Sequence, residues 1–271
     1  MTRFTLTVIG DEILHGSRQD RHFAYFKQLL SDNGLLLAEV CYLPDEEDAL
    51  AEHLRRSFAR GLPSFLTGGI GATPDDHTRQ AAAKALGVPL VLHPEAAALV
   101  NAVSQQRGDA PDSPAARQRL HLAEFPECAA LIPNPYNGIA GFSIRRHYFL
   151  PGFPVMAHPM AEWVLQHDFS GCLNQTERQS RAVWLFGLPE SHLAPLMRQI
   201  EAEWPGIRSF SLPSVGGGGI PAHIEFGIKA EGAACVRIGE AWQAALELLD
   251  GTGAGICEPG RIPDAQSEEA P

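Results

Sequence analysis

Short apolar runs alternate with longer stretches of helical periodicity through the first part of this chain. The apolar runs predict strands at 4–9, 35–43 and 63–66. Apolar residues spaced three or four apart predict helices at 20–32, 44–59 and 78–86. Strands that are separated by single helices imply a mostly parallel sheet with helices on both faces. Such a sheet binds its ligands beyond the carboxyl ends of its strands.

This alternation continues through the middle of the chain and then stops. Further strands are predicted at 129–132 and 147–150, each followed by turn-forming residues, and a helix is predicted at 155–166. We therefore expect a first α/β domain over 1–168, with a domain boundary within 167–180.

A second, smaller domain is predicted over 178–250. Its pattern is a strand, a helix, two strands and a helix, at 182–187, 190–204, 207–212, 223–230 and 233–249. Ile224, Phe226 and Ile228 alternate with polar residues, which is typical of a half-buried antiparallel strand. This order predicts a small α+β domain. Residues 251–271 are rich in Gly, Pro, Asp and Glu and are predicted to be a disordered tail.

Composition and charge narrow the classes of function. The net charge of −11 argues against nucleic acid as a partner, because nonspecific nucleic-acid binding needs a basic face. No apolar run reaches the roughly 18 residues that cross a bilayer, so no membrane association is expected. Five scattered cysteines form no CxxC pair, which indicates reduced thiols and a cytoplasmic protein.

The clearest chemical feature is the segment TGGIGATPDDHT at 67–78, between a predicted strand and a predicted helix. Its glycines permit positive φ and a close approach of the backbone to a phosphate; they are Gly68, Gly69 and Gly71. The same segment also suits a helix cap. In that interpretation Thr73 is the cap, Pro74 takes the first helical position, and Asp75 and Asp76 lie in the first turn. Both interpretations stay open.

Acidic residues at a phosphate site need a compensating charge. A divalent cation such as Mg²⁺ would reconcile Asp75 and Asp76 with an anionic pyrophosphate. A second acidic pair, Asp11 and Glu12, follows the first predicted strand and is expected to face the same crevice. The alternative is that this second pair only caps a turn.

Two turn-rich segments follow later strands. NPYNGIAGF begins at Asn134 and contains Gly138, and LPGFP contains Pro151 and Gly152. We expect Gly138 and Gly152 to lie near each other at the mouth of the crevice, because both follow strands that end on the ligand side. Alternatively, both segments are simply turns.

Four motifs together resemble a known superfamily. GDEILHG, TGGIGATPDDHT, PNPYNGIAGF and LPGFPVMAHPM, in this order, are similar to the molybdopterin-binding proteins MogA, MoaB and CinA, and above all to the N-terminal part of CinA. The resemblance implies a three-layer α/β fold with the ligand at the glycine-rich loop. MogA-like members bind molybdopterin, CinA-like members hydrolyse ADP-ribose with a divalent metal, and members of the superfamily are commonly homo-oligomers.

The resemblance also implies residue roles. Asp76 falls on the aspartate of the glycine-loop motif and Asp11 on that of the GDE motif, which implies catalytic roles for both and metal binding by Asp76, Asp11 and Glu12. The expected ligand contacts are Gly68, Gly69, Gly71, Thr73, Asp75, Thr78, Asn134, Gly138, Pro151 and Gly152. The chain departs from the CinA pattern in three places: His22 stands at about the position of a usual Asn, Ile139 replaces a Thr, and Phe153-Pro154-Val155-Met156 follows the PG where a Ser-Glu is common.

Three functions follow from these observations. The first is a metal-dependent pyrophosphatase that acts on a nucleotide such as ADP-ribose. The second is a protein of molybdenum cofactor biosynthesis that binds a pterin or adenylylates it. The third is a nucleotide-binding module without turnover. The small-molecule partner is therefore a nucleotide or a pterin, and molybdopterin itself is one candidate.

Overall fold

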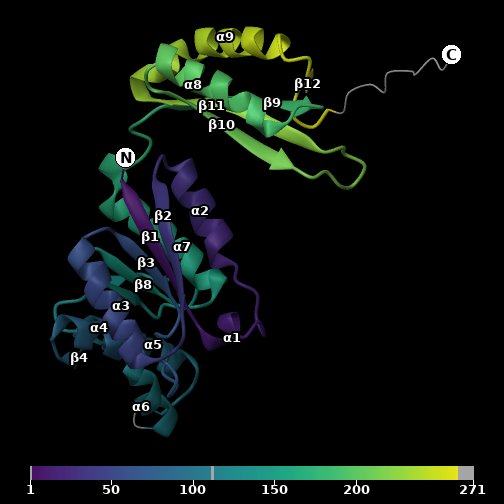
Figure 1. The fold of residues 1–271 in the computed structure, drawn as a ribbon. Coiled ribbons are helices and arrows are strands. Elements are labelled where there is room, and N and C mark those ends of the chain that lie inside the picture. The colour runs from purple at the N-terminus through teal and green to yellow at the C-terminus, as the bar shows by residue number, and fades with distance from the viewer. Residues whose placement is uncertain (1, 111–112, 262–271) are drawn as a thin grey trace. The chain divides into compact units, whose positions relative to one another are not determined.

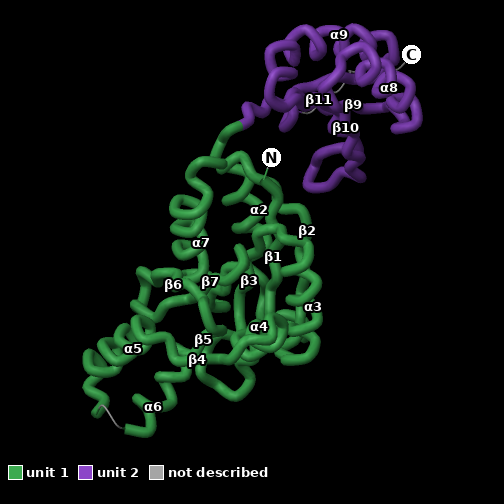
Figure 2. Tube along the Cα trace, turned by 90° about the vertical axis from the view of Figure 1, so that its left-hand side faces the viewer, with its two compact units in different colours: residues 1–175 green, residues 176–271 purple. Residues whose placement is uncertain are grey.

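The computed structural model describes residues 2–110 and 113–261. The chain divides into two compact units, Met1–Gln175 and Thr176–Pro271 (Figure 2). The division falls within the 167–180 stretch where the helix and strand pattern stops. None of the helices in the described residues is both long enough and apolar enough to cross a bilayer.

The first unit is built on a six-stranded sheet with the order β2-β1-β3-β8-β7-β6. Its strands are β1 (Arg3–Ile9), β2 (Leu36–Leu43), β3 (Ser64–Thr67), β6 (Ala130–Ile132), β7 (Gly141–Ile144) and β8 (His147–Leu150). The first four in sheet order pair in parallel, and β7 and β6 continue the sheet antiparallel. The predicted mostly parallel α/β sheet is confirmed.

Helices cover both faces of this sheet, as Figure 1 shows. On one face α2 (His22–Asp32) and α7 (Pro154–Asp168) pack on Phe4, Leu6 and Val8. The other face carries α3 (Glu47–Arg60), α4 (Thr78–Leu86) and α5 (Pro94–Gln106). Phe142 and Phe149 stack in this second core with ring centroids 4.3 Å apart. The alternation of side chains along each strand therefore supplies two separate cores.

Several short elements complete the first unit. They are α1 (Asp11–Leu14), α6 (Pro114–Leu120), the 3₁₀ helices His121–Ala123 and Ser170–Cys172, and the antiparallel pair β4 (Leu90–Leu92) and β5 (Glu124–Pro126). Two of these short elements contribute to the cavity described below, α1 through Glu12 and Ile13 and the 3₁₀ helix His121–Ala123 through Leu122.

The second unit is a four-stranded antiparallel sheet with the order β10-β11-β9-β12. Its elements are β9 (Arg178–Phe186), α8 (Leu193–Glu203), β10 (Ile207–Ser214), β11 (His223–Glu231), α9 (Ile238–Asp250) and β12 (Gly255–Cys257), with 3₁₀ turns at Glu190–His192 and Gly232–Arg237. The two α-helices share one core with the strands. This is the α+β arrangement that the sequence predicts.

The prediction of a disordered tail from residue 251 is wrong for its first part. Residues Gly255–Cys257 form β12 and pair antiparallel with Phe186, Leu185 and Trp184 of β9. A three-residue strand has no periodicity of its own, so only its partner strand reveals it. The rest of the predicted tail, 262–271, lies outside the described residues.

Candidate ligand-binding site

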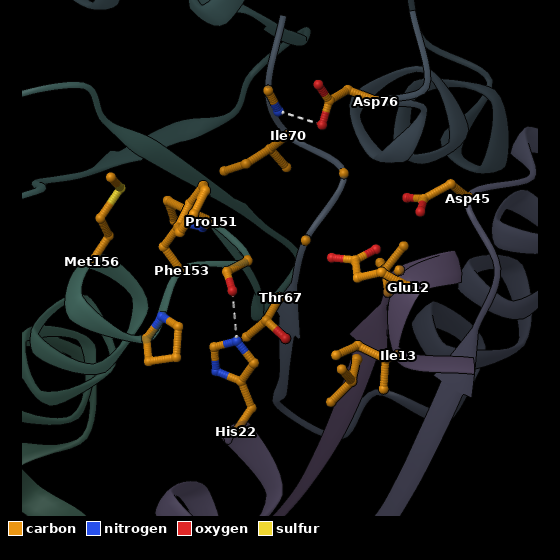
Figure 3. Close-up of a pocket in the computed structure, with 18 of the residues that line it drawn as sticks. Glu12, Ile13, His22, Asp45, Thr67, Ile70, Asp76, Pro151, Phe153 and Met156 are labelled. Atoms are coloured by element: carbon orange, nitrogen blue, oxygen red, sulfur yellow. Dashed lines mark hydrogen bonds between the residues drawn. The ribbon is translucent and has the colours of Figure 1, made fainter. Parts of the chain in front are cut away.

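A cavity of about 950 Å³ opens at the carboxyl end of the parallel sheet. It is formed by the segments that follow β1, β2, β3 and β8, together with the turn between β6 and β7 and the residues that lead into α2. Figure 3 shows the glycine loop between Glu12 and Asp45 on one side and Pro151, Phe153 and Met156 on the other. The predicted position of the crevice matches this placement.

Glycine is required where the loop leaves β3. Gly68 has φ 105°, and a Cβ atom there would lie 2.1 Å from the carbonyl oxygen of Ile9. A Cβ on Gly69 would lie 2.2 Å from Oγ1 of Thr78. The loop therefore lies directly against the end of β1 and the first turn of α4.

Thr78 holds the glycine loop in place through two hydrogen bonds. Its side chain is fully buried, its Oγ1 donates to the carbonyl of Gly68 at 3.0 Å, and its amide donates to the carbonyl of Gly69 at 3.0 Å. Thr78 is not among the residues that line the cavity. Its placement indicates a structural contact in place of the ligand contact that the resemblance implies.

The carboxylate of Asp76 accepts hydrogen bonds from two residues of the glycine loop. Its Oδ1 accepts a hydrogen bond from the amide of Gly71 at 2.8 Å, and its Oδ2 accepts from the amide of Thr73 at 2.9 Å and from the Thr73 hydroxyl. The helix begins at Thr78, with His77 as its N-cap. The prediction that Thr73 caps this helix is therefore wrong, because the Thr73 hydroxyl is taken by Asp76 and the residues between them form a turn.

Arg79 supports the same loop from the interior. It is 2% exposed, and its Nη2 donates to the carbonyl of Gly71. Burial lowers the pKa of Arg79, while the charges of Asp76 and Glu124 oppose that shift. A buried cation beneath the loop offsets part of the negative charge of Asp76, which the sequence pattern did not reveal.

The loop amides divide into two groups. The amide of Gly68 donates to Leu150 at 3.0 Å, and that of Gly71 donates to Asp76. Among the residues that the structure describes, the amides of Gly69, Ile70 and Ala72 have no hydrogen-bond acceptor. The amides of Gly68 and Gly71 are thus engaged within the protein, and the free donors of the loop belong to Gly69, Ile70 and Ala72.

Asp45 is a cavity residue that the sequence analysis missed. Its Oδ2 accepts a hydrogen bond from the amide of Asp11 at 3.0 Å. Burial raises the pKa of Asp45, and the negative charges of Asp11, Glu12 and Asp76 raise it further. The available signal was its position directly after the second parallel strand, at the same sheet edge as the GDE motif.

The structure brings most of the predicted site residues together, but not all of them. The predicted residues that line the cavity are Glu12, Gly68, Gly69, Gly71, Thr73, Asp75, Asp76, Asn134, Pro151 and Gly152. Asp11 lies at the start of α1 and touches Asp45 through its backbone amide. The Asp11 carboxylate is not part of the lining.

Gly138 is also outside the lining, although its neighbours Asn137 and Ile139 contribute to it. Gly138 has φ 75°, and a Cβ there would lie 3.7 Å from the side chain of Val103. Gly152, in contrast, approaches the backbone of Gly68, since its Cβ would lie 3.4 Å from that Cα atom. The segment around Gly138 thus lies at the same cavity as Gly152, as predicted, but it reaches the lining through Asn137 and Ile139 and not through Gly138 itself.

Asn134 acts within its own turn. Its Oδ1 accepts from the amide of Tyr136 at 3.0 Å, and its Nδ2 donates to the carbonyl of Ile139 at 3.0 Å. These bonds hold the turn that forms one end of the cavity. The side chain of Asn134 is buried and shapes the wall.

His22 forms part of the cavity wall beside the Gly152 loop. Its Nε2 lies 3.1 Å from the carbonyl oxygen of Gly152, so this nitrogen donates the hydrogen bond. Burial lowers the pKa of His22. The neighbouring ring of His158 lies 5.4 Å away, and burial lowers the pKa of His158 to about 4. The pair is therefore neutral at physiological pH.

The side of the cavity opposite the carboxylates is apolar. Its side chains include Ile139, Phe153, Val155 and Met156, and Phe153 is 55% exposed. A planar ring packs well on such a surface. The cavity thus joins a polar part with free amides and carboxylates to an apolar part.

The donor chemistry suits a magnesium ion. The described residues contain no group of three or more His, Cys, Asp or Glu side chains arranged to hold a metal. Magnesium, however, is usually held by one or two carboxylates together with the phosphates of its ligand. Asp45 and Glu12 line the cavity and could supply those carboxylates.

Known proteins are similar to much of this chain. The family described as probable molybdopterin binding domain matches residues 5–170. A protein of Pyrobaculum aerophilum is 30% identical over 196 residues, which cover 71% of this chain and 72% of that protein. A CinA-like protein of Citrifermentans bemidjiense is 32% identical over 200 residues, which cover 72% of this chain. The match covers only 47% of that CinA-like protein.

A solved structure shows the same fold. The protein CinA from Thermoplasma acidophilum, whose function is described as unknown, aligns with a TM-score of 0.53 and 24% identity over 61% of this chain and 96% of its own. The family match covers the strands, the glycine loop and the cavity described above. The chain therefore belongs to the family of probable molybdopterin binding domains, and its matched domain is of the CinA type.

Proposed function

We propose that this protein binds a nucleotide pyrophosphate in the cavity of its first unit and hydrolyses it in the presence of a divalent cation. The observation that carries the proposal is the arrangement at the glycine loop. The free amides of Gly69, Ile70 and Ala72 lie in the same cavity as the carboxylates of Glu12 and Asp45. Amide donors suit phosphate oxygens, and carboxylates suit the cation that accompanies them.

Each group has a role in this proposal. The loop amides bind phosphate oxygens, while Asp76 and Thr78 hold the loop in shape. Glu12 and Asp45 would hold the cation. When bound, it supplies Lewis-acid polarisation of a phosphoryl oxygen and a water of lowered pKa. The apolar side around Phe153 would receive the ring of the nucleotide.

The test is incubation of the full chain with ADP-ribose, with Mg²⁺ or with EDTA, and chromatographic detection of AMP. We expect AMP with Mg²⁺ only, and a loss of at least tenfold in rate for Asp45→Asn. Asp32→Asn, at the end of α2 and outside the cavity, is the matched control. If wild-type protein produces no AMP, the hydrolase proposal is wrong.

The second candidate is a pterin ligand from molybdenum cofactor biosynthesis. It is supported by the family description and by the apolar side of the cavity, which suits a pterin ring as well as a nucleobase. Titration with ADP-ribose and with a phosphorylated pterin compares the two ligands directly. Tight ADP-ribose binding without AMP release would instead identify a binding module.

A further inference from the structure

The charges that line the cavity do not balance. Its carboxylates belong to Glu12, Asp45, Asp75 and Asp76, whereas its guanidinium groups belong to Arg18 and Arg21. A pyrophosphate that enters the cavity meets this excess of negative charge. Binding therefore depends on cationic groups that can reach the phosphate oxygens.

Arg18 lies across the mouth of the cavity. Its Nη1 is 3.7 Å from Oε1 of Glu12, and its guanidinium carbon is 5.8 Å from the ring centroid of Phe153. Glu12 follows β1, and Phe153 follows β8, so the guanidinium joins the carboxylate side of the cavity to its apolar side.

Both contacts of Arg18 are weak. The distance to Glu12 exceeds that of a hydrogen bond, and the two side chains are 59% and 45% exposed. Within the described part of the chain, its guanidinium donates no hydrogen bond. An exposed ion pair of this kind contributes little, whereas a guanidinium binds a phosphate through two parallel charge-assisted hydrogen bonds.

The backbone that carries Arg18 is held in place. Its amide donates to the carbonyl of Glu12 at 3.0 Å, and the hydroxyl of Ser17 donates to the same carbonyl at 3.2 Å. The backbone is thus fixed beside Glu12, and the long side chain keeps its rotamer freedom. This combination lets the guanidinium change partners without refolding of the segment.

We propose that Arg18 is a phosphate-binding residue of this cavity, a proposal that rests on the function proposed above. On binding, its guanidinium leaves Glu12 and takes two oxygens of the nucleotide phosphate. The carboxylate of Glu12 would then be free, together with that of Asp45, to hold a divalent cation. The same exchange of partners would therefore assist the binding of both the nucleotide phosphate and the divalent cation.

Arg21 is the internal comparison. It also lines the cavity, immediately before α2, but its guanidinium does not join Glu12 to Phe153. Arg21 therefore contributes positive charge to the cavity but does not lie across its mouth. Removal of Arg21 is expected to weaken phosphate binding less than threefold.

The test uses isothermal titration of the full chain with ADP-ribose, in Mg²⁺ and in EDTA, and with adenosine as a ligand without phosphate. We expect Arg18→Gln to weaken ADP-ribose binding at least tenfold in both conditions and to leave adenosine binding unchanged. Arg18→Lys restores part of the affinity, because it keeps the charge but not the two parallel donors. Arg56→Gln is the control, since Arg56 forms a similar exposed pair with Glu52 at 3.5 Å, outside the cavity.

Two outcomes overturn the assignment of Arg18 alone. One is an ADP-ribose affinity of Arg18→Gln within twofold of wild type, and the other is the tenfold loss in Arg21→Gln in place of Arg18→Gln. Wild-type protein that binds no ADP-ribose in either condition overturns both the assignment and the proposed function. Thermal melts of the variants exclude loss of fold, which is not expected at an exposed side chain.

Discussion

Gly68 allows the glycine loop to lie directly against the end of β1. We expect Gly68→Ala to lower the free energy of unfolding by roughly 3 kcal/mol, because backbone strain of about 1–3 kcal/mol adds to a Cβ contact with Ile9. That contact would measure 2.1 Å. Gly61→Ala is the control, since Gly61 has φ 68° and no atom within 4 Å of an added Cβ. Urea denaturation of both variants measures the difference, and equal losses would contradict the explanation.

A substitution of Asp76 distinguishes a structural role in the glycine loop from a role in metal binding. Its carboxylate accepts from Gly71 and twice from Thr73, and an Asn has only one oxygen to replace both acceptors. We expect Asp76→Asn to weaken ADP-ribose binding by roughly tenfold both with Mg²⁺ and with EDTA. Such a loss corresponds to about 1.4 kcal/mol of binding free energy.

Asp45→Asn provides the contrast for the same titration. Its carboxylate lines the cavity and accepts one amide hydrogen bond, so its loss should matter mainly when Mg²⁺ is present. If Asp76→Asn weakens binding only in Mg²⁺, then Asp76 is a metal ligand and the structural role assigned to it is wrong.

At the scale of elements, a buried histidine connects β8 to α3. His147 is fully buried, its Nε2 lies 2.7 Å from the Ser57 hydroxyl, and its Nδ1 lies 3.0 Å from the carbonyl of Arg145. The carbonyl only accepts, so Nδ1 carries the proton and Nε2 accepts from Ser57. Burial lowers the pKa of His147 to about 4.

This pKa predicts a loss of stability in acid. The folded state favours the neutral imidazole, so its stabilisation is complete above about pH 6.5, the unfolded pKa, and is lost as the pH falls toward 4. The difference in pKa corresponds to roughly 3 kcal/mol. We expect the unfolding free energy of His147→Gln to fall less steeply over this range. His15→Gln, at an exposed position, is the matched control for the substitution.

Short elements show where periodicity fails to predict structure. The helix at Thr78–Leu86 and the strand at His147–Leu150 have the predicted bounds, because each carries a strong local pattern. The strands β4, β5 and β12 have three residues each and exist through their pairing partners. Two predicted helices begin instead as the 3₁₀ turns Glu190–His192 and Gly232–Arg237.

At the scale of the whole molecule, each unit has its own core. The first has two clusters of buried side chains, one on each face of its sheet, and the second has one. Asn174 donates to Asn33 at 2.9 Å in the first unit, while Glu177 accepts from Gly232 at 2.8 Å in the second. The chain between these two anchors is therefore short.

Limited proteolysis tests this division. We expect proteinase K to cleave first between Asn174 and Glu177 and to leave two resistant fragments, because few contacts hold this segment. Mass spectrometry of the fragments gives the positions. The strand Gly255–Cys257 pairs with β9, so cleavage of the C-terminal region should occur after it. A segment at 174–177 that resists cleavage while both units are cut elsewhere would contradict the division.

The mostly parallel sheet, the position of the crevice and the glycine loop could all be predicted from local patterns along the chain. These features depend on residues that are close in the chain, namely on periods of two and 3.6 residues and on glycines at the end of a strand. The pattern also located Glu12 and Gly152 at the cavity, since each follows a parallel strand and such strands end at one edge.

Which atoms of the site are available to a ligand depends on contacts that form only in the folded chain. Asp45 reaches the amide of Asp11 across 34 residues, and His22 reaches Gly152 across 130. The carboxylate of Asp76 accepts its hydrogen bonds from within the glycine loop. The guanidinium of Arg18 reaches across the cavity mouth to the ring of Phe153. Hydrogen bonds and charge contacts depend on distances of a few ångströms between segments that are far apart in the chain, and local periodicity carries no information about those distances.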